Sequence, residues 1–243
     1  MRSDGRSSGQ MRPIKFTPDY TSNAVSSVLI ECGNTKVLCT VSVEEKLPGW
    51  LRDQRGRQGW LTAEYSMLPG ATHTRSRRER PNVSGRTQEI QRLIGRSIRG
   101  ICDLTKIPDL TITIDCDVLQ ADGGTRTTSV TGAYAALKMA VDSLIRQGKI
   151  KQNPITEPIA AVSIGIKEGQ ILVDMNYEED SVADLDMNVV VNCSGKIIEV
   201  QGTAEKQSFT KEQVVLIIDA ATEALHPVFD LQQRAAEGET VES

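Results

Sequence analysis

The sequence predicts an α+β fold made of two related halves that pack as one two-layer unit. A β-hairpin followed by a helix recurs along the chain, and residues 28–41 resemble residues 189–200 in their order of apolar strand, cysteine, glycine turn and lysine-led return strand. No Pro/Gly/Ser-rich linker separates the two parts. We therefore expect one domain over residues 1–243, with halves at about 1–157 and 158–231.

The first half combines alternating strands with two helical patterns. Its strands are expected as a hairpin over residues 25–43 turning near Gly33-Asn34, and as single strands over 60–67 and 110–118. One helix should begin at Thr87, because Ile90, Leu93, Ile94, Ile98 and Ile101 share a helical face. A second should run from about Arg126 to Gln147, ended by Gly148.

The second half repeats the hairpin and the helix. Hairpins are expected over residues 159–166 with 171–177, turning at Glu168-Gly169, and over 187–193 with 196–203, turning at Ser194-Gly195. A capping box at Thr210 begins the last helix, which should stop before Pro227. The polar residues 232–243 are expected to form a flexible tail.

Composition points to the cytoplasm. No apolar run approaches the length of a membrane span, and the first ten residues lack a hydrophobic stretch, so we expect neither membrane contact nor a signal peptide. The five cysteines form no C-x-x-C pair. We interpret them as small buried apolar residues rather than as disulfides or zinc ligands.

Positive charge is concentrated in one region of a chain whose net charge is −4. Residues 51–100 contain eleven arginines, no lysine and four acidic residues. This favours contact with a polyanion, most clearly for the loop over residues 73–85, which lacks periodicity. We expect RNA to be bound by Arg75, Arg77, Arg78, Arg80 and Arg92. Arg52, Arg55 and Arg57 fit equally well as scattered surface or interface charges.

Residues 110–141 carry the strongest chemical signal. A strand runs into Gly123-Gly124, then into hydroxyl residues around Arg126, then into a helix. Glycines let a ligand approach the backbone, and a helix begins with unbonded N–H groups and a positive dipole end. Gly124, Thr125 and Arg126 are therefore predicted to bind phosphate, with Thr127, Thr128 and Ser129 as further hydroxyl donors.

Arg86 offers a second anion contact beside the expected helix start at Thr87. A salt bridge from Arg86 to Glu89 is the alternative. We favour the anion because the other parts of a phosphate site are present.

Five carboxylates lie between residues 178 and 186. Clustered carboxylates repel unless a cation or a proton neutralises them, and oxygen ligands suit Mg²⁺ or Mn²⁺. We predict a metal site at Asp180, Asp184 and Asp186, while a solvated acidic turn is the alternative; Glu178 and Glu179 are expected to face solvent. Asp115, Asp117 and Asp122 are interpreted as backbone caps.

Two common chemistries are disfavoured. The chain has two histidines and no visible Ser–His–Asp pattern, which disfavours histidine acid–base cleavage of RNA. It also lacks the G-x-x-x-x-G-K-[ST] motif of P-loop nucleotidases.

Motifs along nearly the whole chain resemble those of the bacterial ribonuclease PH family, a group of phosphorolytic 3′→5′ exoribonucleases. They are RSDGR (2–6), ATHTR (71–75), GRTQEIQRLIGR (85–96), DVLQADGGTRT (117–127), EDS (179–181), and DMN (186–188) through EVQGTAE (199–205). Each motif alone is weak, and their combination is specific.

The resemblance implies a duplicated βαβα fold of the ribosomal protein S5 domain 2-like type, assembled as a homo-hexamer (a trimer of dimers). It implies trimming of the 3′ ends of tRNA precursors and other structured RNAs, with inorganic phosphate as co-substrate and nucleoside 5′-diphosphates as products. Catalysis would involve Arg86, Arg126, Asp180 and Asp186, with the role of Asp184 less defined.

Three other functions are weighed against this one. A non-catalytic RNA-binding subunit of an exosome-like ring would not need the phosphate arginines together with Asp180 and Asp186. A hydrolytic metal-dependent nuclease would not need the Gly123–Arg126 element. A small-molecule kinase would not need the arginine-rich loop.

Overall fold

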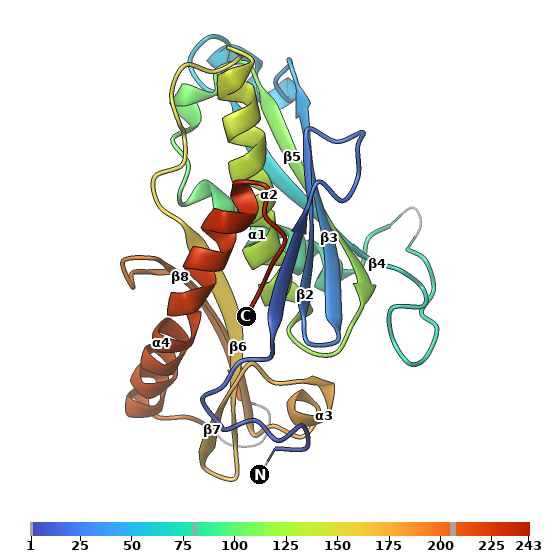
Figure 1. Ribbon diagram of the computed structural model, residues 1–243, viewed down its shortest axis with the longest axis vertical. Helices are drawn as coiled ribbons and strands as arrows, with labels where there is room; N and C mark the ends of the chain where they lie inside the picture. The colour runs from blue at the N-terminus through green and yellow to red at the C-terminus, as the bar shows by residue number, and fades with distance from the viewer. Residues whose placement is uncertain (1, 80–81, 205–207) are drawn as a thin grey trace.

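The computed structural model describes residues 2–79, 82–204 and 208–243, which build two β-sheets and three long helices (Figure 1). The larger sheet has the strand order β10-β1-β2-β3-β5-β4, in which β4 and β5 are parallel and the other pairs antiparallel. The first half contributes β1 (Ile14–Pro18), β2 (Ser26–Cys32), β3 (Thr35–Glu44), η1 (Gly49–Gln54), β4 (Trp60–Met67), α1 (Gly85–Arg99), η2 (Leu104–Lys106), β5 (Thr111–Gln120) and α2 (Thr125–Arg146).

The second half forms an antiparallel sheet in the order β7-β6-β8-β9. Its elements are β6 (Ile159–Lys167), β7 (Gln170–Val173), α3 (Tyr177–Asp180), β8 (Leu185–Asn192), β9 (Ile197–Ala204), α4 (Lys211–Ala236) and β10 (Val241–Glu242). The expected α+β class is confirmed, with the β2–β3 and β8–β9 hairpins at the two places where the sequence repeats.

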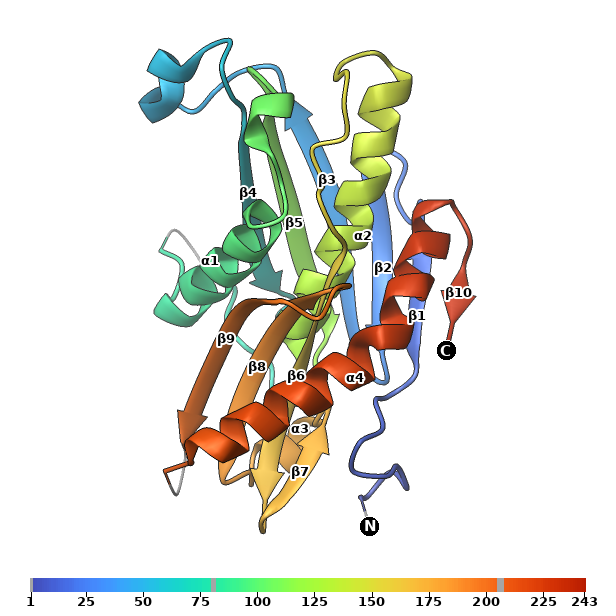
Figure 2. The ribbon, with the colours of Figure 1, turned by 90° about the vertical axis from the view of Figure 1, so that its left-hand side faces the viewer.

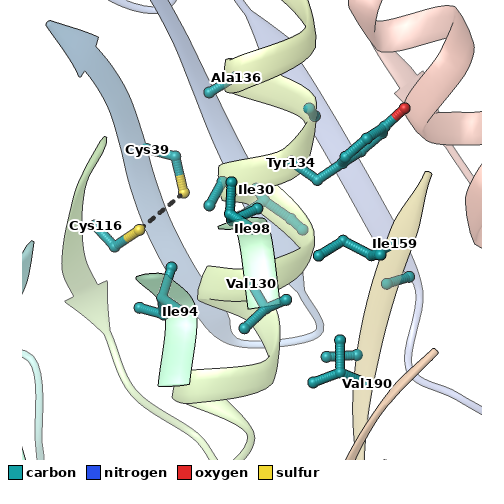
Figure 3. Packing of buried hydrophobic residues seen from close by; sticks show 14 of the residues in the cluster. Ile30, Cys39, Ile94, Ile98, Cys116, Val130, Tyr134, Ala136, Ile159 and Val190 are labelled. Atoms are coloured by element: carbon teal, nitrogen blue, oxygen red, sulfur yellow. Dashed lines mark hydrogen bonds between the residues drawn. The ribbon is translucent and has the colours of Figure 1, made fainter. Parts of the chain in front are cut away.

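Helix α2 joins the halves. It packs on β2 and β3 of the larger sheet and on β6 of the smaller one, while α4 contacts both β6 and β1 (Figure 2). Side chains from both halves meet in one core cluster, including Ile30, Ile94, Val130, Ile159 and Val190 (Figure 3). Burial of this shared apolar surface fixes the N-terminus of α2 relative to the second half.

Two element boundaries near the expected site differ from the predictions. Helix α1 begins at Gly85 instead of Thr87, because the Ser84 hydroxyl accepts a hydrogen bond from Thr87 N and so caps the helix earlier. The strand expected over 171–177 ends at Val173, since Asp174 adopts a left-handed φ of 53°. The short helix α3 follows, with a capping box between Asn176 and Glu179.

The C-terminal segment is packed, contrary to the expected flexible tail. Helix α4 continues through Pro227 to Ala236, because Val228, Leu231 and Ala235 are buried on the core. The fully buried Gln232 donates from Nε2 to the carbonyls of Thr131 (3.0 Å) and Ile159 (2.9 Å). Strand β10 then pairs with β1 and becomes the edge strand of the first-half sheet.

Within the described ranges, no helix has the length and apolar character needed to cross a membrane. The five cysteines are free thiols: Cys32, Cys39 and Cys116 are buried as expected, Cys102 is half-buried, and Cys193 is exposed. The Sγ atoms of Cys39 and Cys116 lie 3.8 Å apart beneath α2 (Figure 3).

Candidate functional site

Segments far apart in the sequence line one cavity of about 490 Å³. Its wall combines the N-terminal ends of α1 and α2 with α3 and the adjoining strands β6 and β8. The lining residues are Met67, Thr72, His73, Thr74, Arg86, Ala121, Gly123, Gly124, Thr125, Arg126, Ser163, Tyr177, Asp180, Asp186 and Asn188. The cavity thus unites the predicted phosphate residues with two of the predicted acids.

The glycine pair forms the turn into α2, as predicted. Gly123 and Gly124 have φ values of 75° and 63°, in the left-handed region that favours glycine. A Cβ on Gly123 would lie 2.4 Å from the Met175 carbonyl oxygen, so a side chain there would push the two loops apart. Gly124 is the N-cap of α2 and supplies no side-chain cap. The first turn of α2 therefore keeps N–H groups for an anion.

The hydroxyl residues of α2 divide into two groups. The hydroxyls of Thr127 and Ser129 donate to the carbonyls of Gly124 and Thr125, within the first turns of the helix. Their protons are therefore used inside the helix, contrary to the expectation that they donate to an anion. Thr125 lines the cavity, and its Oγ1 accepts a hydrogen bond from the Tyr65 hydroxyl (2.9 Å). Because Tyr65 is the donor, the Thr125 hydroxyl can still donate to a ligand.

Two arginines bring positive charge to the cavity from different helices. Arg86 lies inside the first turn of α1 instead of before the helix, and Arg126 lies in the first turn of α2. The alternative partner for Arg86, Glu89, instead pairs with Arg126 at 3.7 Å between Oε1 and Nη1. Burial raises the pKa of Tyr65 above its ordinary value, and the hydrogen bond to Thr125 and the charges of Arg86 and Arg126 offset part of that rise. The field of both guanidinium groups thus reaches the Thr125 hydroxyl.

The predicted triad of acids is only partly assembled. Asp180, at the end of α3, and Asp186, on β8, both line the cavity. The Oδ2 atom of Asp184 instead accepts a hydrogen bond from Glu168 N (2.9 Å) at the β6–β7 turn. Among the residues that the structure describes, no three His, Cys, Asp or Glu side chains are grouped to hold a metal ion. The structure thus brings Asp180 and Asp186 to the cavity, and Asp184 is not among the lining residues.

Two carboxylates still suit a hard divalent cation. Mg²⁺ commonly binds one or two protein carboxylates and completes its shell with water and substrate phosphate. Asp180 and Asp186, in the same cavity as the N-terminal end of α2, provide that donor set.

A buried ion-pair network lies next to the cavity, and the sequence interpretation missed it. Glu179, expected to face solvent, is 6 % exposed and bonded by both oxygens to Arg2, at 2.7 and 2.6 Å. Asp174 is 3 % exposed and pairs with Arg12 at 2.6 Å. A carboxylate in an acidic stretch gives no sequence signal of burial when its partner arginine lies some 170 positions away.

Of the three acids interpreted as caps, Asp122 is confirmed. Its two oxygens accept from Tyr177 N (3.2 Å) and from the Asn34 side chain (3.1 Å). Asp115 and Asp117 lie half-buried on β5, where burial and the nearby Glu64 raise the pKa of both carboxyls.

Four further cavity residues were not predicted. Ser163 on β6 and Asn188 on β8 are register partners, both buried, and the Ser163 hydroxyl has no partner within the described chain. His73 and Tyr177 place their rings 6.2 Å apart at the same cavity. The pairing of β6 with β8 brings Ser163 beside Asn188, and no local sequence pattern predicts that contact.

The basic loop leaves the cavity directly. Thr72, His73 and Thr74 line the cavity, and the side chains of Arg75, Arg77 and Arg78 that follow are exposed, as is Arg92 on α1. Arg80 lies outside the described residues. Glu79 accepts from Ser84 N (3.2 Å) and from the Thr87 hydroxyl (3.1 Å), which ties the loop to the start of α1.

The sequence and the fold of this chain are similar to those of known proteins. Residues 10–141 match the model of the 3′ exoribonuclease family, domain 1, and residues 157–224 match that of domain 2. The chain is 53 % identical over 234 residues to ribonuclease PH of Crocosphaera subtropica, covering 96 % of this chain and 97 % of that protein. It is 52 % identical over 236 residues to ribonuclease PH of Bacillus subtilis, covering 96 % of each.

Solved structures share the fold at lower identity. Rice (Oryza sativa) Rrp46 superposes with a TM-score of 0.77 at 19 % identity, covering 97 % of this chain and 100 % of that one. A chain of the Archaeoglobus fulgidus exosome with RNA bound to the active site gives 0.79 at 21 % identity, covering 96 % and 92 %.

The buried Asp174 generates a prediction about pH. Burial alone would raise the pKa of Asp174, yet hydrogen bonds and charge from Arg12, with Arg6, lower it beneath its ordinary value of 3.8. A lowered pKa stabilises the fold above the unfolded value and loses that contribution as pH falls through the folded value. We expect Asp174→Asn to lower Tm at pH 6, and the difference from the unmutated protein to shrink below pH 3.8.

Thermal unfolding from about pH 2.5 to 6 measures this effect. Asp219→Asn, at an exposed position on α4, is the matched control and should leave the profile unchanged. A Tm difference for Asp174→Asn that stays constant across the range would contradict the lowered pKa.

Proposed function

This chain belongs to the 3′ exoribonuclease family, in its ribonuclease PH branch, and from that premise we propose how its cavity works and which RNA it trims. The protein is a phosphorolytic 3′→5′ exoribonuclease, a nucleotidyltransferase that uses inorganic phosphate. The observation that carries the residue assignment is the meeting of Arg86, Thr125 and Arg126 with Asp180 and Asp186 in one cavity.

The attacking phosphate is held at the N-terminal end of α2. Backbone N–H groups after Gly124 and the Thr125 hydroxyl donate to its oxygens, while Arg86 and Arg126 supply two guanidinium forks. Glu89 holds Arg126 only from a largely exposed position, so an incoming anion can replace it. Binding the nucleophile in a fixed orientation removes most of the entropic cost of the reaction.

In the reaction, an oxygen of this phosphate attacks the terminal 3′ phosphodiester in line with the leaving O3′. The new P–O bond forms as the P–O3′ bond breaks, and O3′ leaves as the hydroxyl of the shortened RNA. The product is a nucleoside 5′-diphosphate, and the step is reversible. Arg86 and Arg126 neutralise the charge that spreads over the equatorial oxygens.

Asp180 and Asp186 are the residues that would hold Mg²⁺ or Mn²⁺. When bound, such a cation stabilises negative charge on the phosphoryl and leaving oxygens. Both carboxylates line the same cavity as Arg86 and Arg126, so a cation held there would add to the two guanidinium groups in balancing the charge of the phosphates. Asp184 supports the neighbouring turn instead.

The substrate class follows from the charges beside the cavity. We assign RNA backbone binding to Arg75, Arg77, Arg78 and Arg80 on the loop and to Arg92 on α1, of which Arg80 lies outside the described residues. Such contacts bind phosphates without reading sequence and suit a structured body next to a single-stranded 3′ end. The 3′ ends of tRNA precursors and of other structured RNAs have that form.

We further propose that the chain works as a homo-hexamer in the cytoplasm. Large apolar side chains are exposed on several faces, among them Trp50 at 67 %, Leu216 at 56 % and Ile197 at 51 %. Exposed apolar groups of this size are typical of contact surfaces between subunits. Free thiols suit a reducing compartment.

The decisive experiment incubates the protein with a tRNA carrying extra 3′ nucleotides, with and without phosphate and Mg²⁺, and identifies the released nucleotides. We expect nucleoside 5′-diphosphates that appear only when phosphate is present. Nucleoside monophosphates in phosphate-free buffer would indicate hydrolysis. RNA that is bound but never shortened would indicate a non-catalytic ring subunit.

Arg126→Ala should slow phosphorolysis by roughly ten- to a hundredfold, because a charge-assisted donor contributes about 1.5–3 kcal/mol to binding the transition state. The ratio kcat/KM for phosphate measures the loss. Arg146→Ala, at the exposed C-terminal end of the same helix, is the control and should keep normal turnover. Near-normal turnover in Arg126→Ala would remove Arg126 from the phosphate site.

Replacing Arg75, Arg77 and Arg78 together by Ala should flatten the salt dependence of tRNA binding. Each lost phosphate contact reduces the log–log slope by about 0.7–0.9, so we expect a change of up to roughly two to three. Replacing the equally exposed Arg52, Arg55 and Arg57 removes the same charge from another place and is the matched control. Equal slopes for the two triple variants would exclude a specific role of the loop.

A further inference from the structure

Three arginines near the N-terminus are buried next to the cavity without lining it. The N-terminal segment runs past α3 and β7 (Figure 1), and Ser8 O accepts a hydrogen bond from Val173 N at 2.8 Å. Arg2, Arg6 and Arg12 are 9, 8 and 5 % exposed. Arginines are seldom buried without a specific partner, and each of these forms an ion pair with a buried carboxylate, Glu179 or Asp174.

We propose that Arg12 is a positioning residue, which fastens the phosphate-binding loop of the first half to the segment of the second half that carries Asp180. The inference rests on the proposed function, since it explains how attacking phosphate and acids keep their relative positions. In this proposal Arg12 does not contact the substrate.

One side of Arg12 binds the second half. Its backbone N and its Nε both donate to Asp174 Oδ2 at 2.8 Å, and its Nη2 donates to Asp174 Oδ1 at 2.6 Å. Asp174 holds the strained left-handed turn that ends β7, six residues before Asp180. The bidentate pair therefore fixes the backbone from which α3 starts.

The other side of Arg12 binds the first half. Its Nη1 donates to the carbonyl of Asp122, and its Nη2 lies 3.5 Å from the carbonyl oxygen of Gly123. These carbonyls directly precede Gly124, the N-cap of α2. One planar guanidinium thus joins two loops that lie against each other beside the cavity.

A lysine cannot reproduce this arrangement. The guanidinium presents donors in a rigid fork, so it can bind a carboxylate on one edge and carbonyls on another. An ammonium group is a single point of charge on a flexible stem, and it would stay with the Asp174 carboxylate. Arg12→Lys should therefore keep the buried ion pair and loosen the link to Asp122 and Gly123.

Arg2 is the matched control inside the same network. Its guanidinium binds Glu179 by two hydrogen bonds and also donates to the carbonyls of Val173 (2.8 Å) and Asp174 (2.9 Å). It donates as well to the carbonyls of Ser7 (3.3 Å) and Gln10 (3.1 Å) in the N-terminal segment, and none of these partners lies in the phosphate-binding loop. Arg2→Lys should therefore disturb the acidic and N-terminal segments and leave the phosphate-binding loop in place.

The first test separates kcat from KM. In the full-length protein, Arg12→Lys should lower kcat for phosphorolysis by about ten- to a hundredfold, because a small misplacement of reacting groups has an effect of that size. The KM for phosphate should stay within about threefold, since Arg86, Thr125 and Arg126 are intact. An unchanged kcat, or a loss carried by KM alone, would overturn the proposal.

The second test does not depend on activity. Amide hydrogen exchange should become about fivefold faster in Arg12→Lys over both residues 121–126 and residues 174–181. In Arg2→Lys, of these two segments, it should rise over 174–181 alone. The proposal is wrong if residues 121–126 are unchanged in Arg12→Lys, or if they respond equally in the two variants.

A measurement on the unmutated protein keeps the proposal testable should Arg12→Lys fail to fold. In metal-free buffer, inorganic phosphate should slow exchange over 121–126 and, through Arg12, over 174–181 as well. Protection confined to 121–126 would overturn the link. Failure of phosphate to bind would count against the proposed function; where Arg12→Lys folds, the exchange comparison with Arg2→Lys decides the role of Arg12 on its own.

Discussion

The close approach of Gly123 to the backbone of Met175 and Asn176 is the contact on which the site depends. A Cβ at Gly123 would lie 2.4 Å from a carbonyl oxygen and 2.7 Å from the next carbonyl carbon. Glycine thus allows a loop of the first half to touch a loop of the second. Without this contact the N-terminal end of α2, to which we assign phosphate, and the helix that carries Asp180 would belong to separate surfaces. The shared core around α2 supplies the rigid frame that keeps them together.

Much of the fold and the phosphate site could be predicted from sequence, because their determinants are local. Alternation, helical spacing and the glycine pair before Thr125 all act over a few residues, and they located the hairpins, α1, α2 and the α2 N-terminus. The errors came from tertiary contacts. Pro227 did not end α4, since burial of Val228, Leu231 and Ala235 outweighs the lost hydrogen bond. The sequence predicts an exposed Glu179, because its partner Arg2 lies 177 positions away and leaves no local signal of burial.

The acidic segment shows why composition alone could not assign its members. Its carboxylates divide among four environments: Glu178 is exposed to solvent, Glu179 is buried in an ion pair, Asp184 accepts a backbone hydrogen bond at a turn, and Asp180 and Asp186 line the cavity. All are acidic residues within a few positions, and the path of the backbone separates them. The end of β7 at Asp174 starts that division, because the left-handed turn there begins the path into α3.

Charge in the molecule is arranged by depth as well as by sign. Arg75, Arg77 and Arg78, to which we assign RNA binding, are exposed and act at long range, where salt screens them. Arg126 is half-buried at the cavity, where fewer waters compete and its contacts are stronger, and Arg86 lines the same cavity from a more exposed position. Arg2 and Arg12 are buried and neutralised by carboxylates, so they add little net field and instead hold the backbone. In our proposal the same residue type attracts RNA, binds phosphate and maintains geometry, and the surroundings of each arginine decide which of the three it does.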